Sequence, residues 1–152
     1  MEFGRFASEN KKKRNEGKPE TFNFLGFTHI CGKTRKNGKF TIWRQTIKKK
    51  MHKKLEEVKD ELKKRMHEPI QCTGKWLKAV ATGHFRYYGV PGSYEAMNDF
   101  GHLIAQKWKQ SLKRRSQKAA ITWEKMTKLM DRWIHLPRIC HKYPSERFGV
   151  TI

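Results

Sequence analysis

The sequence predicts an α+β fold that is mainly α-helical: a short N-terminal β-hairpin followed by about four helices. From residue 46 onward, apolar residues recur three and four positions apart, which is the spacing of a helix face. Residues 21–43 hold instead two short, aromatic-rich runs around a glycine-bounded turn, a pattern typical of a hairpin.

The composition indicates a folded and strongly basic chain. Its 152 residues suffice for one domain with a modest core or for two small subdomains, and five Trp, nine Phe and four Tyr are too many for a disordered tail. Lys and Arg number 35 against 14 Asp and Glu, which gives a net charge of +21. This excess favours a polyanionic partner, above all nucleic acid.

The sequence also bears on location. A membrane surface is the weaker alternative partner, because no predicted helix pairs a basic face with a broad exposed apolar one. No apolar run approaches the length of a transmembrane helix, and the first residues do not start a signal peptide. The cysteines, Cys31, Cys72 and Cys140, are odd in number and far apart, which favours reduced thiols. We therefore expect a cytoplasmic protein in a reducing compartment, with no membrane contact.

The first twenty residues lead us to expect that this chain is the C-terminal piece of a longer protein. Phe3–Ala7 resembles the last part of a buried apolar strand, and residues 10–19 form a polar, basic loop. The hairpin comes next, with a strand over residues 22–27 and a return strand over 39–43. Its turn, GKTRKNG, carries Lys33, Arg35 and Lys36.

A basic helix is predicted over residues 46–66, capped by Thr46 and ended before Pro69. Its apolar positions are Ile47, Met51, Leu55, Val58, Leu62 and Met66. Its first turns hold the lysines Lys48, Lys49, Lys50, Lys53 and Lys54 and no acid. Positive charge there opposes the helix dipole, so we expect an external anion; a merely solvated lysine-rich face is the alternative. The pairs Asp60–Lys64 and Glu61–Arg65 should add local stability.

The remaining helices are predicted over residues 71–88, 93–115 and from Thr122 onward. One face of the first of these should hold Trp76, Val80, Gly83 and Tyr87, with Leu77, Ala81, His84 and Tyr88 beside it. The apolar stripe, or buried face, expected for the helix over residues 93–115 consists of Met97, Phe100, Ile104, Trp108 and Leu112. At helical spacing, the tryptophans Trp76, Trp108, Trp123 and Trp133 are expected in the core rather than as base-stacking platforms.

No catalytic or metal-binding pattern is evident. Two-metal nucleotidyl transfer needs clustered carboxylates, but Asp60, Asp99 and Asp131 lie on separate predicted helices. The pairs His29/Cys31 and Cys140/His141 lack the spacing of zinc ligands. The sequence thus predicts no enzyme activity for this chain, no metal and no other cofactor.

Binding chemistry is better represented. The hairpin turn, the start of the basic helix and the basic run Lys113, Arg114 and Arg115 give three cationic patches that suit phosphate contacts. Tyr87 and Tyr88 offer rings that could stack on an unpaired base, or else pack one in the core and one at the surface.

Several segments, in order, resemble the reverse transcriptases/maturases encoded by group II introns. Residues 21–28, TFNFLGFT, resemble the F-x-F-L-G-F segment that ends the palm of that family. Residues 74–77 and 83–89 resemble its maturase-specific element, and Trp108 before residues 113–115 resembles a later helix of it. Residues 141–148, HKYPSERF, resemble its H-P-Y-P-x-x-R-F ending, although Lys142 replaces the usual proline.

The resemblance implies a division of the chain and a role for it. Residues 1–45 would end the palm with a hairpin, 46–70 would form the basic thumb helix, and 71–152 the maturase-specific RNA-binding domain. The primer-grip-like residues would be Phe24, Leu25, Gly26 and Phe27. The chain carries no Y-A-D-D motif, so the resemblance implies a truncated or split maturase from a mobile element, bacterial in origin.

The implied partner is group II intron RNA, whose splicing and retrohoming the family assists; a template–primer duplex or DNA target is a further implied partner. Two other hypotheses stay open. The chain could be a stand-alone structural RNA-binding protein, although an unpartnered strand at Phe3–Ala7 would argue against this. It could also be half of a split RNA-directed DNA polymerase, completed by a separately encoded N-terminal half.

Overall fold

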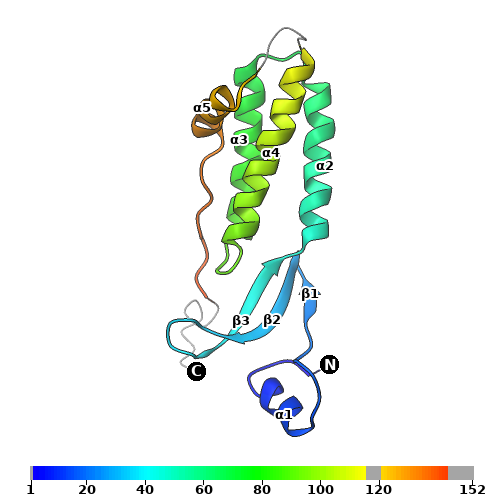
Figure 1. Ribbon diagram of the computed structural model, residues 1–152, viewed down its shortest axis with the longest axis vertical. Helices are drawn as coiled ribbons and strands as arrows, with labels where there is room; N and C mark the ends of the chain where they lie inside the picture. Colours follow the sequence, from blue (N-terminus) through cyan, green and yellow to red (C-terminus); the bar gives the residue numbers. More distant parts are fainter. Residues whose placement is uncertain (1, 116–120, 144–152) are drawn as a thin grey trace.

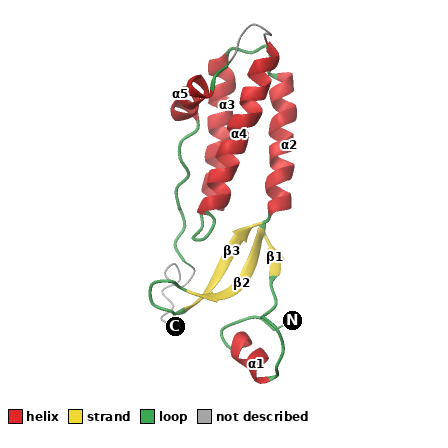
Figure 2. Cartoon of the chain, in the orientation of Figure 1, coloured by secondary structure: helices red, strands yellow, loops and turns green. Residues whose placement is uncertain are grey.

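The computed structural model describes residues 2–115 and 121–143, and the molecule is elongated (Figure 1). A small sheet lies in the middle, with α2, α3 and α4 side by side beyond one end and α1 beyond the other (Figure 2). The elements in order are α1 Ala7–Lys13, β1 Phe22–Phe24, β2 Phe27–Lys33, β3 Phe40–Thr46, α2 Lys48–Lys64, α3 Ile70–Tyr88, α4 Tyr94–Arg115 and α5 Trp123–Trp133. The predicted α+β, mainly α fold class is confirmed.

The sheet is antiparallel, with strand order β1–β2–β3. The predicted hairpin between β2 and β3 is present, and its register runs from Phe27 opposite Thr46 to Lys33 opposite Phe40. A single strand over 22–27 is wrong, because Leu25 (φ 47°) and Gly26 (φ 82°) form a tight turn between β1 and β2. Positive φ at both central residues is typical of a type I′ hairpin turn.

A turn at residues 4–6 stands where the buried strand was expected at Phe3–Ala7, and α1 follows from Ala7 into the first residues of the expected loop. Glu9 in its first turn and lysines in its last turn both suit the helix dipole. Ala7 is buried, whereas Phe6 is 61% exposed, so the apolar residues of this segment are not buried together as expected. Phe3 instead packs edge-on against Phe22 of β1, with ring centroids 4.7 Å apart.

A single core joins α2, α3, α4 and α5. The apolar spacing predicted for α2 is confirmed, since its buried residues are Met51, Leu55, Val58 and Leu62. The stripe predicted for α4 is also confirmed, since Met97, Phe100, Ile104, Trp108 and Leu112 are all buried. Thr46 ends β3 and does not cap α2. The helix begins at Lys48, and Ile47 occupies its N-cap position. The core includes residues from both predicted segments, 46–70 and 71–152.

Helix α3 buries a different face from the one expected first. Its buried residues are Thr73, Gly74, Leu77, Ala81, His84 and Phe85. Trp76 and Val80 are only partly buried at the edge of the core, and Gly83 and Tyr87 are exposed. The neighbouring row of residues therefore faces α4, and the expected row borders the space between α3 and α2.

The C-terminal part begins with α5, and Thr122 caps it as predicted: the Lys125 amide donates to the Thr122 Oγ1 at 3.3 Å. The chain then runs back along α3 toward the sheet (Figure 1). There the amides of Cys140 and His141 donate to the carbonyl of Gly89, at 2.8 and 2.9 Å. Residues 144–148 of the segment that resembles the maturase ending lie outside the described residues.

The four tryptophans expected in the core have different environments. Trp108 is fully buried. Trp76 and Trp133 are partly buried, with the Arg65 guanidinium 5.0 Å from the centre of the Trp76 ring. Trp123 is 52% exposed and carries the Lys109 ammonium over its ring at 3.8 Å, so the core assignment is wrong for it. The spacing of apolar residues alone does not distinguish a tryptophan ring that is buried in the core from one that covers the edge of the core.

The three cysteines are free thiols, partly exposed in Cys31 and exposed in Cys72 and Cys140. Within residues 2–115 and 121–143, no helix has both the length and the apolar character needed to cross a membrane.

Candidate nucleic-acid interface

The structure places the predicted cationic patches at three different heights. Lys33, Arg35 and Lys36 lie at the β2–β3 tip, a full strand length away from the point where β3 leads into α2 (Figure 1). The α2 lysines lie at the sheet end of the helices, whereas Lys113, Arg114 and Arg115 lie at the opposite end. All six residues outside α2 are exposed, and the three patches do not merge into one site.

The two halves of α2 differ in how their charges are paired. In the second half, Lys59, Lys63 and Lys64 each pair with an acid of the same helix. The predicted Glu61–Arg65 pair is present at 2.9 Å, but Asp60 pairs with Lys63 rather than with Lys64. Hydrogen bonds from Lys59 and Lys107 lower the pKa of Glu56 to about 2, so this carboxylate stays charged.

The first half of α2 is almost without such partners. Lys54 pairs with Glu57 at 3.0 Å, but Lys48, Lys49, Lys50 and Lys53 make no ion pair with any described residue. The exposed residues Lys48, Lys49 and Lys50 also lie in the first turn, where the helix dipole is unfavourable to them. Local interactions therefore do not account for this positive charge.

A groove of about 510 Å³ separates this part of α2 from α3. Lys50, Lys53, Lys54 and Glu57 line it from α2. From α3 it is lined by Ala79, Val80, Gly83, His84 and Tyr88. One wall is thus cationic and the other is made of small and aromatic side chains, and the volume falls in the usual range of ligand pockets.

His84 lines the groove next to the core. Its ring stacks on Phe100 of α4, with centroids 3.6 Å apart and planes 12° apart, and Tyr88 lies 4.5 Å away. Only 9% of the residue is exposed, and its Nε2 is buried without a hydrogen-bond partner among the described residues. Burial, and then the charge of Lys54, lower the pKa of His84 to about 4, so the ring is neutral near pH 7.

Tyr87 and Tyr88 join the groove to the β1–β2 turn. The Tyr87 hydroxyl donates to the carbonyl of Leu25 at 2.8 Å, and both tyrosine rings contact Phe27. Tyr87 is half exposed and Tyr88 is more buried, so the surface-and-core alternative describes their packing. The hydroxyl of Tyr87 is engaged in this contact, which leaves ring surface rather than a polar tip for a ligand.

The four primer-grip-like residues do not form one strand: Phe24 ends β1, Leu25 and Gly26 form the turn, and Phe27 begins β2. Phe24 and Leu25 are largely exposed, whereas Phe27 is buried under the tyrosines. The turn is fixed from α2 as well, because the Ile47 amide donates to the carbonyl of Gly26 at 3.0 Å. The structure therefore brings the turn, the tyrosine pair and the α2 lysines into one neighbourhood.

A second hollow, of about 670 Å³, lies between the turn and the end of α3. Its lining includes Leu25, His29, Arg44, Arg86 and Tyr87. Gly83 lines this hollow as well as the α2–α3 groove, so the two spaces meet there.

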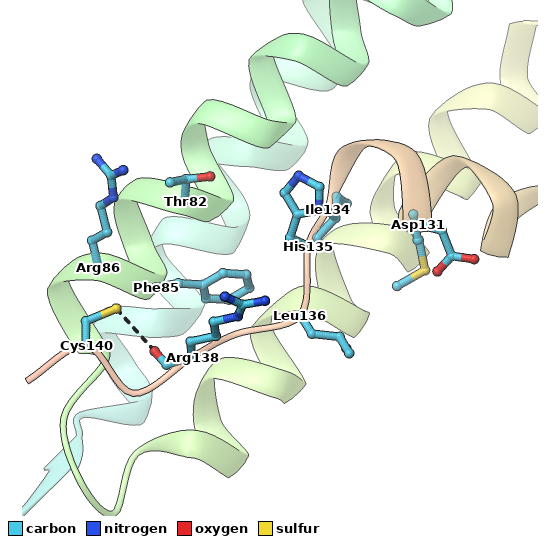
Figure 3. A pocket seen from close by; sticks show the side chains of 10 residues that line it. Thr82, Phe85, Arg86, Asp131, Ile134, His135, Leu136, Arg138 and Cys140 are labelled. Carbon is cyan, nitrogen blue, oxygen red and sulfur yellow. Dashed lines mark hydrogen bonds between the residues drawn. The ribbon is translucent and has the colours of Figure 1, made fainter.

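A third hollow, of about 680 Å³, lies where the C-terminal segment passes over α3 (Figure 3). Phe85 and Thr82 of α3 face Ile134 and Leu136 across it, and the Cys140 thiol donates to the Arg138 carbonyl at 3.4 Å. Its two arginines, Arg86 and Arg138, are accompanied by the carboxylate of Asp131. This mixed lining lacks the one-sided charge of the α2–α3 groove.

The predicted helices keep the three aspartates apart. Asp60, Asp99 and Asp131 lie exposed on α2, α4 and α5. In the part of the chain that the structure describes, no three His, Cys, Asp or Glu residues come together as ligands for a metal ion.

Some residues of this neighbourhood were missed by the sequence reasoning. Arg44 and Arg86 were not predicted as site residues. His84 was predicted only to lie beside a packed face, and Gly83 was assigned to that face although it is exposed. The one available signal was the His84–Tyr88 spacing of four residues, which places both side chains on one helix face beside the lysines. No protein-family model, curated protein or solved structure was found to match this chain.

Proposed function

We propose that this chain is the RNA-binding part of a group II intron reverse transcriptase/maturase. It binds intron RNA and assists splicing and retrohoming, without a polymerase active site of its own, since it carries no Y-A-D-D motif. The ordered resemblance of its segments to that family supports the proposal. A template–primer duplex or a DNA target is a further partner of the same surface.

The observation that carries the proposal is the unpaired charge on the first half of α2. Four lysines there have no ion-pair partner among the described residues, and three lysines line the groove beside Tyr88. Exposed lysines that are left unpaired beside aromatic rings suit the phosphates and bases of RNA. A solvated face would not need a groove between two helices.

A pair of charge-matched variants tests the proposal. The groove variant, Lys49→Gln, Lys50→Gln, Lys53→Gln, removes three unpaired lysines, two of which line the groove. The matched variant, Lys59→Gln, Lys63→Gln, Lys64→Gln, removes three lysines that pair with acids of the same helix. Each phosphate contact contributes about 0.7 to the slope of log K against log salt for single strands. The groove variant should therefore lower the slope by about 2 units, and the matched variant by less than half of that.

Binding of a labelled intron RNA, measured by fluorescence anisotropy over a range of salt concentrations, gives both slopes. Equal slopes for the two variants would contradict the assignment of the interface to the first half of α2. They would leave net charge as the source of binding.

A stand-alone structural RNA-binding protein is the second candidate. It gains from one observation: the N-terminal residues pack on this chain's own sheet, through the Phe3–Phe22 contact and a bond from the Gly4 amide to the Cys31 sulfur at 3.4 Å. The unpartnered strand that argued against this candidate is absent. The third candidate, half of a split polymerase, is separated from both by co-purification with an N-terminal partner half.

A further inference from the structure

Gly83 lies in the interior of α3, although no neighbouring group packs so closely there that only glycine would fit. A Cβ built there would have no described atom within 4 Å, whereas Gly74 of the same helix faces a tryptophan ring closely. Glycine inside a helix is less favourable than alanine by about 1 kcal/mol. The position is therefore open where a side chain would stabilise the helix, and it borders both the groove and the second hollow.

One residue that lines the groove carries an unsatisfied, buried polar atom. His84 adjoins Gly83, is nine-tenths buried, and its Nε2 has no partner among the described residues. Such an atom normally finds a hydrogen bond, from the protein or from a ligand. The lysines that frame the groove have long, flexible side chains that can rearrange when a ligand enters.

We propose that the α2–α3 groove binds one unpaired nucleotide of an RNA strand, with its phosphate among Lys50, Lys53 and Lys54 and its base over Gly83 against Tyr88. A base in this position lies next to His84, whose Nε2 is buried without a hydrogen-bond partner among the described residues. This inference rests on the proposed RNA-binding function and names the form of RNA that the groove accepts.

The geometry favours an unpaired strand over a duplex. The groove lies between two helices of one bundle, a space too narrow for a double helix, whereas a single base can enter it and stack on an aromatic ring. The second hollow shares Gly83 with the groove and is also lined by Tyr87 and Arg86, so it offers space for a neighbouring nucleotide.

Gly83→Leu is the direct test, because it fills the groove without changing the charge of the protein. The position is exposed and the substitution raises helix propensity, so the variant should fold; circular dichroism checks this. Gln71→Leu is the matched control, since Gln71 is an exposed residue of α3 that lines none of the hollows described. The probes are a short oligouridine and an RNA duplex of the same length.

We expect Gly83→Leu to weaken oligouridine binding about tenfold, with little change for the duplex, because one stacked base and its phosphate contact are lost. Gln71→Leu should bind both probes as the unmodified protein does. Unchanged oligouridine binding by Gly83→Leu overturns the groove site while leaving RNA binding intact. An equal loss for both probes overturns the preference for an unpaired strand. Failure of the unmodified protein to bind either RNA contradicts the proposed function itself.

Discussion

His84 is held neutral by its surroundings. Its ring lies between Phe100 and Tyr88, and the ammonium of Lys54 is the nearby charge that disfavours protonation. Both burial and that charge lower the pKa of His84 to about 4. A neutral imidazole has one donor and one acceptor nitrogen, which suits the edge of a base better than an imidazolium would.

The lowered pKa of His84 predicts how stability depends on pH. Between pH 6.5 and 4 the unfolded chain binds a proton at His84 that the folded chain does not. The free energy of unfolding should therefore fall as the pH falls through this range, by about 2 kcal/mol at pH ~4.5 relative to pH ~7. Urea denaturation at the two pH values measures the loss.

The control for this prediction is His84→Phe, which keeps a ring against Phe100 and removes the titrating group. Its stability should lose about 2 kcal/mol less on acidification than that of the unmodified protein. The same loss in both proteins would mean that other groups carry the acid sensitivity.

At the scale of elements, α5 packs closely on α3 because α3 has a glycine, Gly74, at the contact. A Cβ at Gly74 would lie 2.7 Å from the Trp133 ring, so only glycine lets that ring reach the α3 backbone. Met126 and Ile134 complete the contact with the core. The position of α5, and of the C-terminal segment that follows it, depends on this close approach.

Two alanine substitutions in α3 separate packing from helix propensity. Gly74→Ala should destabilise the protein by about 1–3 kcal/mol, because the added methyl group overpacks the Trp133 ring. Gly83→Ala, where the space is open, should stabilise it by about 0.5–1 kcal/mol. Thermal unfolding measures whether each substitution raises or lowers the stability. The rate of amide hydrogen exchange in α5 should rise only for Gly74→Ala. Stabilisation by both substitutions would show that α5 does not pack on Gly74 in solution.

The helices were more predictable than the sheet for a physical reason. The stripes of α2 and α4 face a core along their whole length, so their apolar spacing matched their burial. The β1–β2 turn breaks an alternating aromatic run at Leu25, a residue that rarely adopts positive φ. Two long-range contacts support it, from the Tyr87 hydroxyl and the Ile47 amide, and neither is visible in local sequence.

For the whole molecule, the candidate site depends on how α3 is rotated in the bundle. The sequence identified the α2 lysines and the tyrosine pair separately. It could not place Tyr88 opposite Lys50, Lys53 and Lys54 in one groove, because the buried row of residues on α3 was mistaken for its neighbour. The same rotation exposes Gly83 and turns His84 toward Phe100, so periodicity, which assigned both residues to packed rows, did not indicate that they line a groove.

The arrangement of charge distinguishes recognition from simple attraction. A net charge of +21 attracts any polyanion, and that attraction weakens steeply with salt. Base stacking is less sensitive to salt than the contacts between lysines and phosphates, and it depends on the shape of the RNA. The proposed function therefore requires a preference between RNAs that persists when electrostatic attraction is screened.

The most direct test is a salt titration of binding to a structured group II intron RNA, with an unrelated duplex RNA of equal length as competitor. A maturase surface predicts tighter binding to the intron RNA, and a preference that remains at moderate salt. Equal affinity for both RNAs, lost together as salt rises, would contradict the proposed function and leave only non-specific attraction by a basic protein.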